Sequence, residues 1–218
     1  MTADRWHVLV PVRGGRAGKT RLREIESQPL TGSDRTALAA AMAADTVSAA
    51  LAADCGPVSV VTAAAETAAW VTRLGARVVA DSGGGLNAAL GTALEGVDAG
   101  MGAVALLGDL PAVLGADIAE ALALAGATGP AFVPDWEGTG TTLAAFPVHG
   151  RADVTLAFGT GSARRHAELG LTPVGLSLDR LRCDVDTPKA WDRAVRLGLG
   201  PATADVRRRL LRSQLSDQ

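Results

Sequence analysis

The chain has 218 residues, and its 21 Lys and Arg against 23 Asp and Glu leave a formal net charge of −2. This balance argues against a binder of nucleic-acid backbones, which would carry a basic excess. Four Trp, three Phe and no Tyr are too few for a stacking platform on single-stranded nucleic acid. Hydrophobic residues make up 48% of the chain, enough for a globular core, and we expect one domain over residues 1–218.

Short β-like runs alternate with Ala-rich helical stretches along the chain. We expect strands at His7–Val12, Val58–Thr62, Arg77–Ala80, Ala103–Leu107, Ala131–Val133, Thr142–Phe146 and Val174–Leu178. We expect helices at Asp34–Ala53, with Ser33 or Asp34 as its cap, and at Ala64–Leu74, Leu86–Val97, Ile118–Ala125, Ser162–Leu169, Pro188–Leu197 and about 202–215. The alternation predicts an α/β, Rossmann-like fold with a mostly parallel sheet and helices on both faces.

Cysteine usage and targeting signals are uninformative beyond a few exclusions. Cys55 and Cys183 lie far apart and no CxxC is present, so neither a disulfide framework nor a cysteine metal site is predicted. No apolar run approaches the roughly 18 residues of a membrane span. The amino terminus lacks the layout of a signal peptide. We therefore expect a cytoplasmic protein.

The loop after the first strand is basic and rich in glycine. Its run Gly14-Gly15-Arg16-Ala17-Gly18-Lys19-Thr20 is one residue short of the Walker A spacing. In parallel sheets, ligands bind at the carboxyl ends of the strands. We expect a triphosphate to bind the cations at this end, namely Arg13, Arg16, Lys19, Arg21 and Arg23. A solvated basic loop is the alternative.

Three aspartates are candidate metal ligands. Asp109 directly follows a buried strand, and Asp184 and Asp186 are two residues apart, which in extended backbone places both carboxylates on one face. A divalent cation such as Mg²⁺ relieves the repulsion between neighbouring carboxylates and also binds phosphate oxygens. The alternatives are a turn at Asp109 and a helix cap at Asp186 or Thr187 before Pro188.

Two further loops offer glycines and hydroxyls. One is Gly138-Thr139-Gly140-Thr141-Thr142, before a strand, and the other is Phe158-Gly159-Thr160-Gly161-Ser162, before a helix. Ser162 is expected to cap that helix, and Arg164 and Arg165 in its first turn are best explained by a nearby anion. Ordinary turns are the alternative for both loops.

No hydrolase or dinucleotide motif is present. The chain lacks G-x-S-x-G, and no G-x-G-x-x-G follows the first strand. His7, His149 and His166 have neither an Asp partner nor a nucleophile motif, so none is expected to be a catalytic base.

The ordered motifs of the chain resemble the 2-phospholactate/phosphoenolpyruvate guanylyltransferases of deazaflavin coenzyme F-420 biosynthesis. The resemblance runs from residue 8 to about 203. It rests on six short motifs in order, namely Lys19-Thr20-Arg21-Leu22, Leu86-Asn87, Gly108-Asp109-Leu110-Pro111, Gly138-Thr139-Gly140-Thr141, Phe158-Gly159…Ser162…His166 and Cys183-Asp184-Val185-Asp186-Thr187. Each motif alone is weak, whereas the ordered set is specific.

The resemblance implies a nucleotidyltransferase-type, MobA-like sheet and a reaction of GTP with a phosphorylated three-carbon acid. It implies metal binding by Asp109, Asp184 and Asp186, with Mg²⁺ as the cofactor, and acid binding by Thr141, Gly159 and Ser162. Lys19 would act in catalysis by neutralising the triphosphate and Asp109 through the metal. Arg13, Lys19, Arg21 and Asn87 would bind the nucleotide. A homodimer is left open.

Two features depart from the family pattern. Arg13 stands where the family often has Lys, which changes a point charge into a planar fork. Thr160 and Gly161 replace a stretch that contains Pro, so we expect a more flexible loop there.

The Ala-rich, Lys-poor composition, typical of actinobacterial members, favours phosphoenolpyruvate as the acid. The alternatives are 2-phospholactate or 3-phosphoglycerate as the acceptor, another nucleotidyltransferase of this fold, a P-loop kinase or NTPase, and a GTP-binding module without catalysis. Because the attacking phosphate oxygen is already anionic, the reaction needs no general base.

Overall fold

The computed structural model describes residues 5–13, 21–81, 83–148 and 154–215. Its strands are β1 (Trp6–Pro11), β2 (Glu24–Ile25), β3 (Gln28–Pro29), β4 (Val58–Thr62), β5 (Arg77–Ala80), β6 (Gly102–Leu106), β7 (Ala131–Pro134), β8 (Thr141–Phe146) and β9 (Thr172–Pro173). Its helices are α1 (Gly32–Ala52), α2 (Ala65–Leu74), α3 (Leu86–Glu95), α4 (Gly115–Thr128), α5 (Ser162–Glu168), α6 (Pro188–Leu197) and α7 (Pro201–Leu215).

A seven-stranded sheet in the order β5-β4-β1-β6-β8-β7-β9 forms the centre of the molecule. Strands β5, β4, β1 and β6 pair in parallel, and so do β7 and β9. Only β8 runs antiparallel to its two neighbours, β6 and β7. The prediction of a mostly parallel sheet is confirmed.

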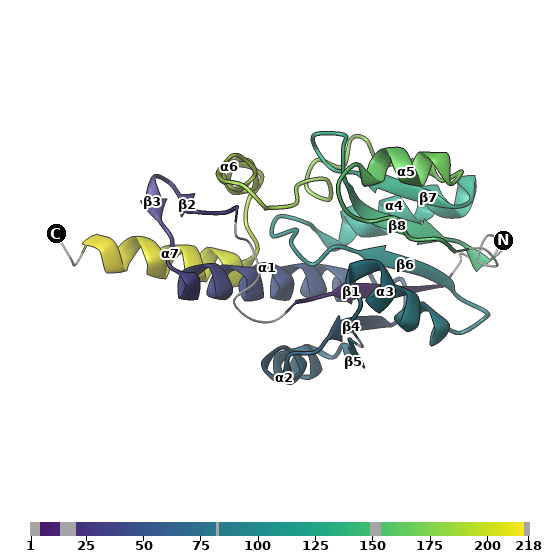
Figure 1. Ribbon diagram of the computed structural model, residues 1–218, viewed down its shortest axis with the longest axis horizontal. Helices are drawn as coiled ribbons and strands as arrows, with labels where there is room; N and C mark the ends of the chain where they lie inside the picture. Colours follow the sequence, from purple (N-terminus) through teal and green to yellow (C-terminus); the bar gives the residue numbers. More distant parts are fainter. Residues whose placement is uncertain (1–4, 14–20, 82, 149–153, 216–218) are drawn as a thin grey trace.

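Helices cover both faces of this sheet, as predicted (Figure 1). Val8 and Val10 of β1 belong to a core that also contains residues of α1, α2 and α4, such as Val47, Val71 and Ile118. Leu9, between them in sequence, points to the opposite core, which contains residues of α3 and α5. Because side chains alternate along a strand, the unbroken apolar run of β1 serves both cores.

A third hydrophobic core lies beyond the sheet. It joins the β2–β3 hairpin, the amino-terminal half of α1, α6 and α7, which we call the outer lobe (Figure 1). Trp191 of α6 is fully buried there. Asp45 of α1 accepts hydrogen bonds from the backbone N–H groups of Ala202 (2.9 Å) and Thr203 (2.8 Å), so α1 caps the first turn of α7.

Several expected boundaries are wrong in detail. The strand expected at Val174–Leu178 is a turn, because Gly175 has φ +66° and its carbonyl accepts from Leu178 N at 3.0 Å. Helix α1 begins at Gly32 and is capped by Thr31, whose side chain and Asp34 form a reciprocal capping box, instead of by Ser33 or Asp34. Helix α4 is longer than expected, and the β2–β3 hairpin was not predicted.

No helix in the described part of the chain is both long enough and apolar enough to cross a membrane.

Candidate active site

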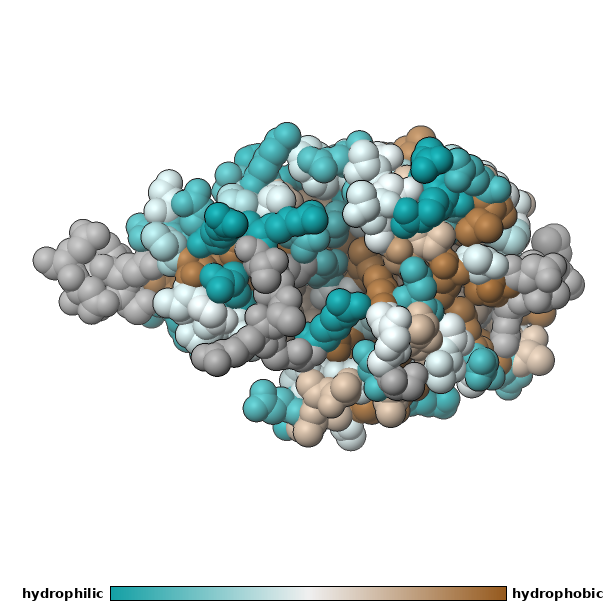
Figure 2. Space-filling view, viewed as in Figure 1, coloured by the Kyte–Doolittle hydropathy of each residue, from teal (hydrophilic) through white to brown (hydrophobic). Residues whose placement is uncertain are grey.

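The predicted site residues gather where the carboxyl ends of the central strands face the outer lobe. Figure 2 shows this side of the molecule hollowed between the lobe and the sheet, with hydrophobic atoms visible inside the hollow. Asp109 follows β6, Arg13 follows β1, and the segment with Asp184 and Asp186 precedes α6. This is the edge at which parallel sheets bind ligands.

The loop that carries Asp109 is held tightly. A Cβ on Gly108 would lie 2.9 Å from the carbonyl oxygen of Pro11, so only glycine permits this close approach of the loop to β1. The N–H of Leu110 donates to the hydroxyl of Thr46 on α1 at 3.1 Å, and that hydroxyl donates to Met42 O at 2.9 Å. Sequence reasoning missed Thr46, which is fully buried and shapes the loop from a distant helix.

The segment with the acidic pair is bonded directly to this loop. Val185 N donates to the carbonyl of Asp109 at 3.0 Å. Cys183 and Val185 are buried in the outer lobe, whereas Asp184 and Asp186 are partly exposed. The alternation agrees with the expected placement of both aspartates on one face. The backbone bond brings Asp109 beside this pair.

The helix cap at this point belongs to another residue. Thr187 caps α6, because its side chain accepts from Ala190 N at 3.2 Å, and Pro188 occupies the first turn. Of the two cap candidates, Thr187 is therefore correct and Asp186 is not.

The three aspartates do not form a complete metal cage. Within the described ranges, no group of three or more His, Cys, Asp or Glu side chains lies close enough together to hold a metal ion. Mg²⁺ typically takes one or two carboxylates and completes its shell with water and substrate phosphate oxygens. The donors present therefore fit a cation that arrives with a nucleotide.

The basic loop is only partly described. Arg13 and Arg21 are both exposed, at the two ends of the gap, while Lys19 lies outside the described residues, as does the rest of the run 14–20. Leu22 and Ile25 then enter the outer-lobe core. Arg13 thus follows the sheet and Arg21 adjoins the lobe.

The structure brings the predicted acid-binding residues together around the start of α5. Ala163 N donates to Thr139 O at 3.2 Å, which joins the start of α5 to the Gly-Thr loop, and Ser162 N donates to Gly159 O at 3.0 Å. Thr141 and Ser162 are buried at 3% and 2% exposure, and Gly159 is exposed with φ +116°.

A buried histidine connects these elements. His166 is fully buried, and its Nδ1 lies 2.9 Å from the hydroxyl of Thr141 while Ala157 N donates to its Nε2 at 3.1 Å. Burial, with the neighbouring Arg165 guanidinium, lowers the pKa of His166 to about 4. The ring is therefore neutral at physiological pH and is not a proton carrier there.

The loop 157–160 is pinned by several side chains. Arg165 donates to the carbonyls of Ala157 and Thr160. The amide of Asn87, at the start of α3, accepts from Phe158 N at 2.9 Å and donates to Phe158 O at 3.1 Å. These bonds hold the backbone of the loop without a proline, and its flexibility relative to family members that contain Pro stays a prediction.

Other expectations about this region also bear on its side chains, and those about Ser162 and the two arginines need correction. The side-chain amide of Asn87 bonds Phe158 in both directions, so it positions this loop; its second N–H is not used in these two bonds, and binding of the nucleotide by Asn87 stays a prediction. Ser162 does not cap α5, whose N-cap is Gly161 without a side-chain bond. Arg164 pairs with Glu168 at 2.6 Å and Arg165 binds loop carbonyls, so neither arginine requires a nearby anion.

The Gly-Thr loop depends on two residues that sequence reasoning missed. Asp135 accepts from the backbone N–H groups of Thr139 (2.8 Å) and Gly140 (2.7 Å). Arg182 donates to the carbonyls of Pro134, Asp135 and Leu176. An Asp three residues before the first glycine of the turn was the available signal for the first contact.

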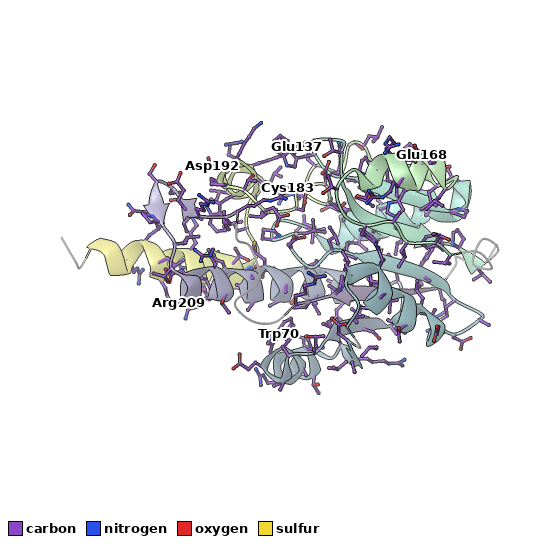
Figure 3. The ribbon with its side chains drawn as sticks, viewed as in Figure 1. Trp70, Glu137, Glu168, Cys183, Asp192 and Arg209 are labelled. Atoms are coloured by element: carbon purple, nitrogen blue, oxygen red, sulfur yellow. The ribbon has the colours of Figure 1, made fainter. Side chains whose placement is uncertain are left out.

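Cys183 is structural. It lies between α6 and the β7–β8 loop, which carries Glu137 (Figure 3). Burial raises the pKa of its thiol to about 12, so the reactive thiolate is not formed at neutral pH.

Comparison with known proteins decides the family. Residues 34–178 match the MobA-like NTP transferase domain. The phosphoenolpyruvate guanylyltransferase of Geodermatophilus obscurus is 44% identical over 204 residues, covering 91% of this chain and 92% of that protein. The chain belongs to this guanylyltransferase family.

A second family member and a solved structure agree. The phosphoenolpyruvate guanylyltransferase of Thermomonospora curvata is 43% identical, covering 94% of this chain and 90% of that protein. A nucleotidyl transferase from Methanothermobacter has a similar fold, with a TM-score of 0.56 and 20% identity, covering 88% of this chain and 98% of that one. The expected MobA-like nucleotidyltransferase fold is thereby confirmed.

Proposed function

We propose that this guanylyltransferase joins GTP and phosphoenolpyruvate to give enolpyruvoyl-2-diphospho-5′-guanosine and pyrophosphate. A phosphate oxygen of phosphoenolpyruvate attacks the α-phosphorus of GTP. The new P–O bond forms as the bond between the α-phosphorus and the bridging oxygen to the β-phosphate breaks, and pyrophosphate leaves with that electron pair. No proton has to be removed from the nucleophile, which agrees with the neutral, enclosed His166.

The observation that carries the proposal is the bond between Val185 N and Asp109 O. It places the acidic pair beside Asp109 at one edge, while the Gly-Thr loop and α5 assemble Thr141, Gly159 and Ser162 into a second group. A carboxylate side that can hold a cation and a second side with hydroxyl and backbone N–H groups are two of the parts that such a transfer needs. The relatives named for this reaction support the choice of substrates.

The roles of the individual residues follow from charge. One or two of Asp109, Asp184 and Asp186 would bind Mg²⁺ directly, with phosphate oxygens of the nucleotide completing its shell, and the bound ion would neutralise charge on the phosphates. Arg13, Lys19 and Arg21 would bind the triphosphate, with Lys19 stabilising the charge that develops on the leaving pyrophosphate. Thr141 and the backbone at Gly159 and Ser162 would hold the acid in line with the α-phosphorus.

Release of pyrophosphate tests this function. The protein is incubated with Mg²⁺, GTP and, separately, phosphoenolpyruvate, 2-phospholactate and 3-phosphoglycerate. Release with phosphoenolpyruvate is expected. If no pyrophosphate is released with any of the three acids, the guanylyl transfer is contradicted. Release with 2-phospholactate alone would contradict only the choice of acid. CTP, ATP and UTP beside GTP test the base selectivity.

The P-loop kinase or NTPase considered from the basic loop does not agree with the MobA-like domain and the guanylyltransferase relatives. It would also release phosphate or a nucleoside diphosphate instead of pyrophosphate, so the same assay separates it. Two earlier expectations stay predictions. A cytoplasmic location and a homodimer are to be tested by fractionation of cells and by sedimentation of the purified protein.

A further inference from the structure

The contacts of His166 fix which ring nitrogen carries the proton. The N–H of Ala157 can only donate, and it points at Nε2 at 3.1 Å. Nε2 must therefore present its lone pair, and the neutral ring carries its proton on Nδ1. Since Nδ1 lies 2.9 Å from the Thr141 oxygen, Nδ1–H donates and that oxygen accepts.

This assignment determines the state of the Thr141 hydroxyl. A hydroxyl has one hydrogen to donate, and that hydrogen cannot point at a nitrogen that is itself a donor. The hydrogen is therefore left for another acceptor. Thr141 is 3% exposed and lies next to the Gly-Thr loop that adjoins α5, where an anionic ligand would supply such an acceptor.

The surroundings of the ring keep this arrangement in place. His166 is fully buried, and the rings of Phe132 and Phe158 lie 5.9 and 5.2 Å from it, centroid to centroid. Arg165, the charged group identified beside the ring, donates to loop carbonyls and disfavours an imidazolium. An uncharged, enclosed ring cannot easily exchange its tautomer, so the direction of the bond to Thr141 is stable.

We propose that His166 is a positioning residue that forces the Thr141 hydroxyl to donate its hydrogen to an anionic oxygen of the acid substrate. The inference rests on the proposed function and adds a selective element to it. The acid site then presents a donor at Thr141, so it selects a carboxylate or phosphate oxygen and rejects a donor group at that point. Sequence reasoning named Thr141 without its partner.

Two variants separate the two hydrogen bonds of His166, the one with Thr141 and the one with Ala157. In His166→Asn the amide nitrogen can take the position of Nδ1 and still donate to Thr141. In His166→Gln the amide oxygen can take the position of Nε2 and accept from Ala157, while the donor to Thr141 is lost. Arg164→Ala, on the exposed side of the same helix, is the control.

The kinetic constants of these variants test the proposal. We expect His166→Gln to raise the KM for phosphoenolpyruvate by about 10–100-fold, as for the loss of one hydrogen bond to a charged group. His166→Asn should raise it much less, and the KM for GTP should stay within about 2-fold in both, as for a site that the change does not touch. Equal effects of Asn and Gln, with both proteins folded by circular dichroism, would overturn the proposal.

A double-mutant cycle excludes a purely structural role. Thr141→Val removes the hydroxyl, so adding His166→Gln to it should cost no further affinity for phosphoenolpyruvate. Additive losses would overturn the inference. In long-range ¹H–¹⁵N spectra of the wild-type protein, the unprotonated ring nitrogen should be Nε2, and finding Nδ1 unprotonated would also overturn it.

These outcomes are distinct from failure of the proposed function. If the wild-type protein releases no pyrophosphate with any acid, the guanylyl transfer fails. Calorimetric binding of phosphoenolpyruvate in the presence of GTP and Mg²⁺ then decides the inference. Weaker binding by the Gln variant than by the Asn variant supports it, and equal binding by the two, or no binding by the wild type, overturns it.

Discussion

The proposed acid side and the proposed nucleotide side of the site are built in different ways. On the acid side, Asn87, Arg165 and His166 hold the backbone of loop 157–160 through hydrogen bonds from three directions. On the nucleotide side, Arg13 and Arg21 are exposed. We therefore expect the first side to be preorganised by the protein and the second to depend more on the charges that a nucleotide and its cation bring.

The difference matches the two ligands. A three-carbon acid offers few atoms for recognition, so its binding and selectivity depend on groups that are already in place. A triphosphate carries several charges, and exposed cations attract it without a rigid arrangement.

The largest expected effect is on the aspartates. Asp109→Asn removes a charge beside the acidic pair and should lower kcat by about 10³-fold or more, because a cation bound there would lose a carboxylate ligand. The fold should survive, since the backbone bond to Val185 is kept. Pyrophosphate release measures the loss, and the exposed Asp192→Asn on α6 is the control (Figure 3). Near-normal turnover would remove Asp109 from the catalytic machinery.

The next prediction concerns pH and the rigid acid side. The pKa of His166 is about 4 in the folded chain, against about 6.5 when unfolded. The unfolded state therefore binds the extra proton between these values, so stability is full above pH 6.5 and falls as the pH drops toward 4. The difference of about 2.5 pKa units corresponds to about 3 kcal/mol.

Urea unfolding at pH 7 and pH 4.5 measures this effect. Between pH 7 and pH 4.5, the free energy of unfolding of the wild type should fall by about 2–3 kcal/mol more than that of His166→Gln. Equal losses in both proteins would show that the ring is not held neutral by the fold, and the acid side would then be less rigid than the structure indicates.

Asn87 tests which side of the site it serves. Asn87→Ala removes both bonds to Phe158 and should raise the KM for phosphoenolpyruvate by about 10-fold, since loop 157–160 loses a clamp, and leave the KM for GTP nearly unchanged. Asn87→Asp keeps the acceptor for Phe158 N, so its KM for phosphoenolpyruvate should lie between those of the wild type and Asn87→Ala. A larger change in the KM for GTP would support the sequence-based assignment of Asn87 to the nucleotide.

Local sequence patterns made much of the fold predictable. The β2–β3 hairpin was missed because its turn carries no such pattern. The buried run of β1 and the alternation of strands with helices are visible in the sequence. The β2–β3 hairpin turns at Glu26 and Ser27, whose φ values are +49° and +65°. Such turns are usually marked by Gly or Asn, so a Glu-Ser turn gives no signal. Leu22 and Ile25 of the same region pack into a core made by distant elements.

In the site too, local features were predictable from the sequence and contacts between distant residues were not. The face shared by Asp184 and Asp186 follows from their spacing, which is a local property. The contacts of Asn87 with Phe158 and of His166 with Thr141 span 71 and 25 residues. No periodicity indicates such pairings, so motif matching named Asn87 and Thr141 but missed the partner of each residue.

The smallest expected effect tests the exposed side directly. Arg21→Ala should raise the KM for GTP by only about 2–5-fold, because one exposed charge contributes about 1 kcal/mol or less. The effect should shrink further at high salt, where exposed charges are screened. Steady-state kinetics at low and high ionic strength measure it, with the exposed Arg73→Ala of α2 as the control. A loss of 100-fold or more that persists in salt would show that Arg21 is fixed against the phosphates, and the nucleotide side would then be as preorganised as the acid side.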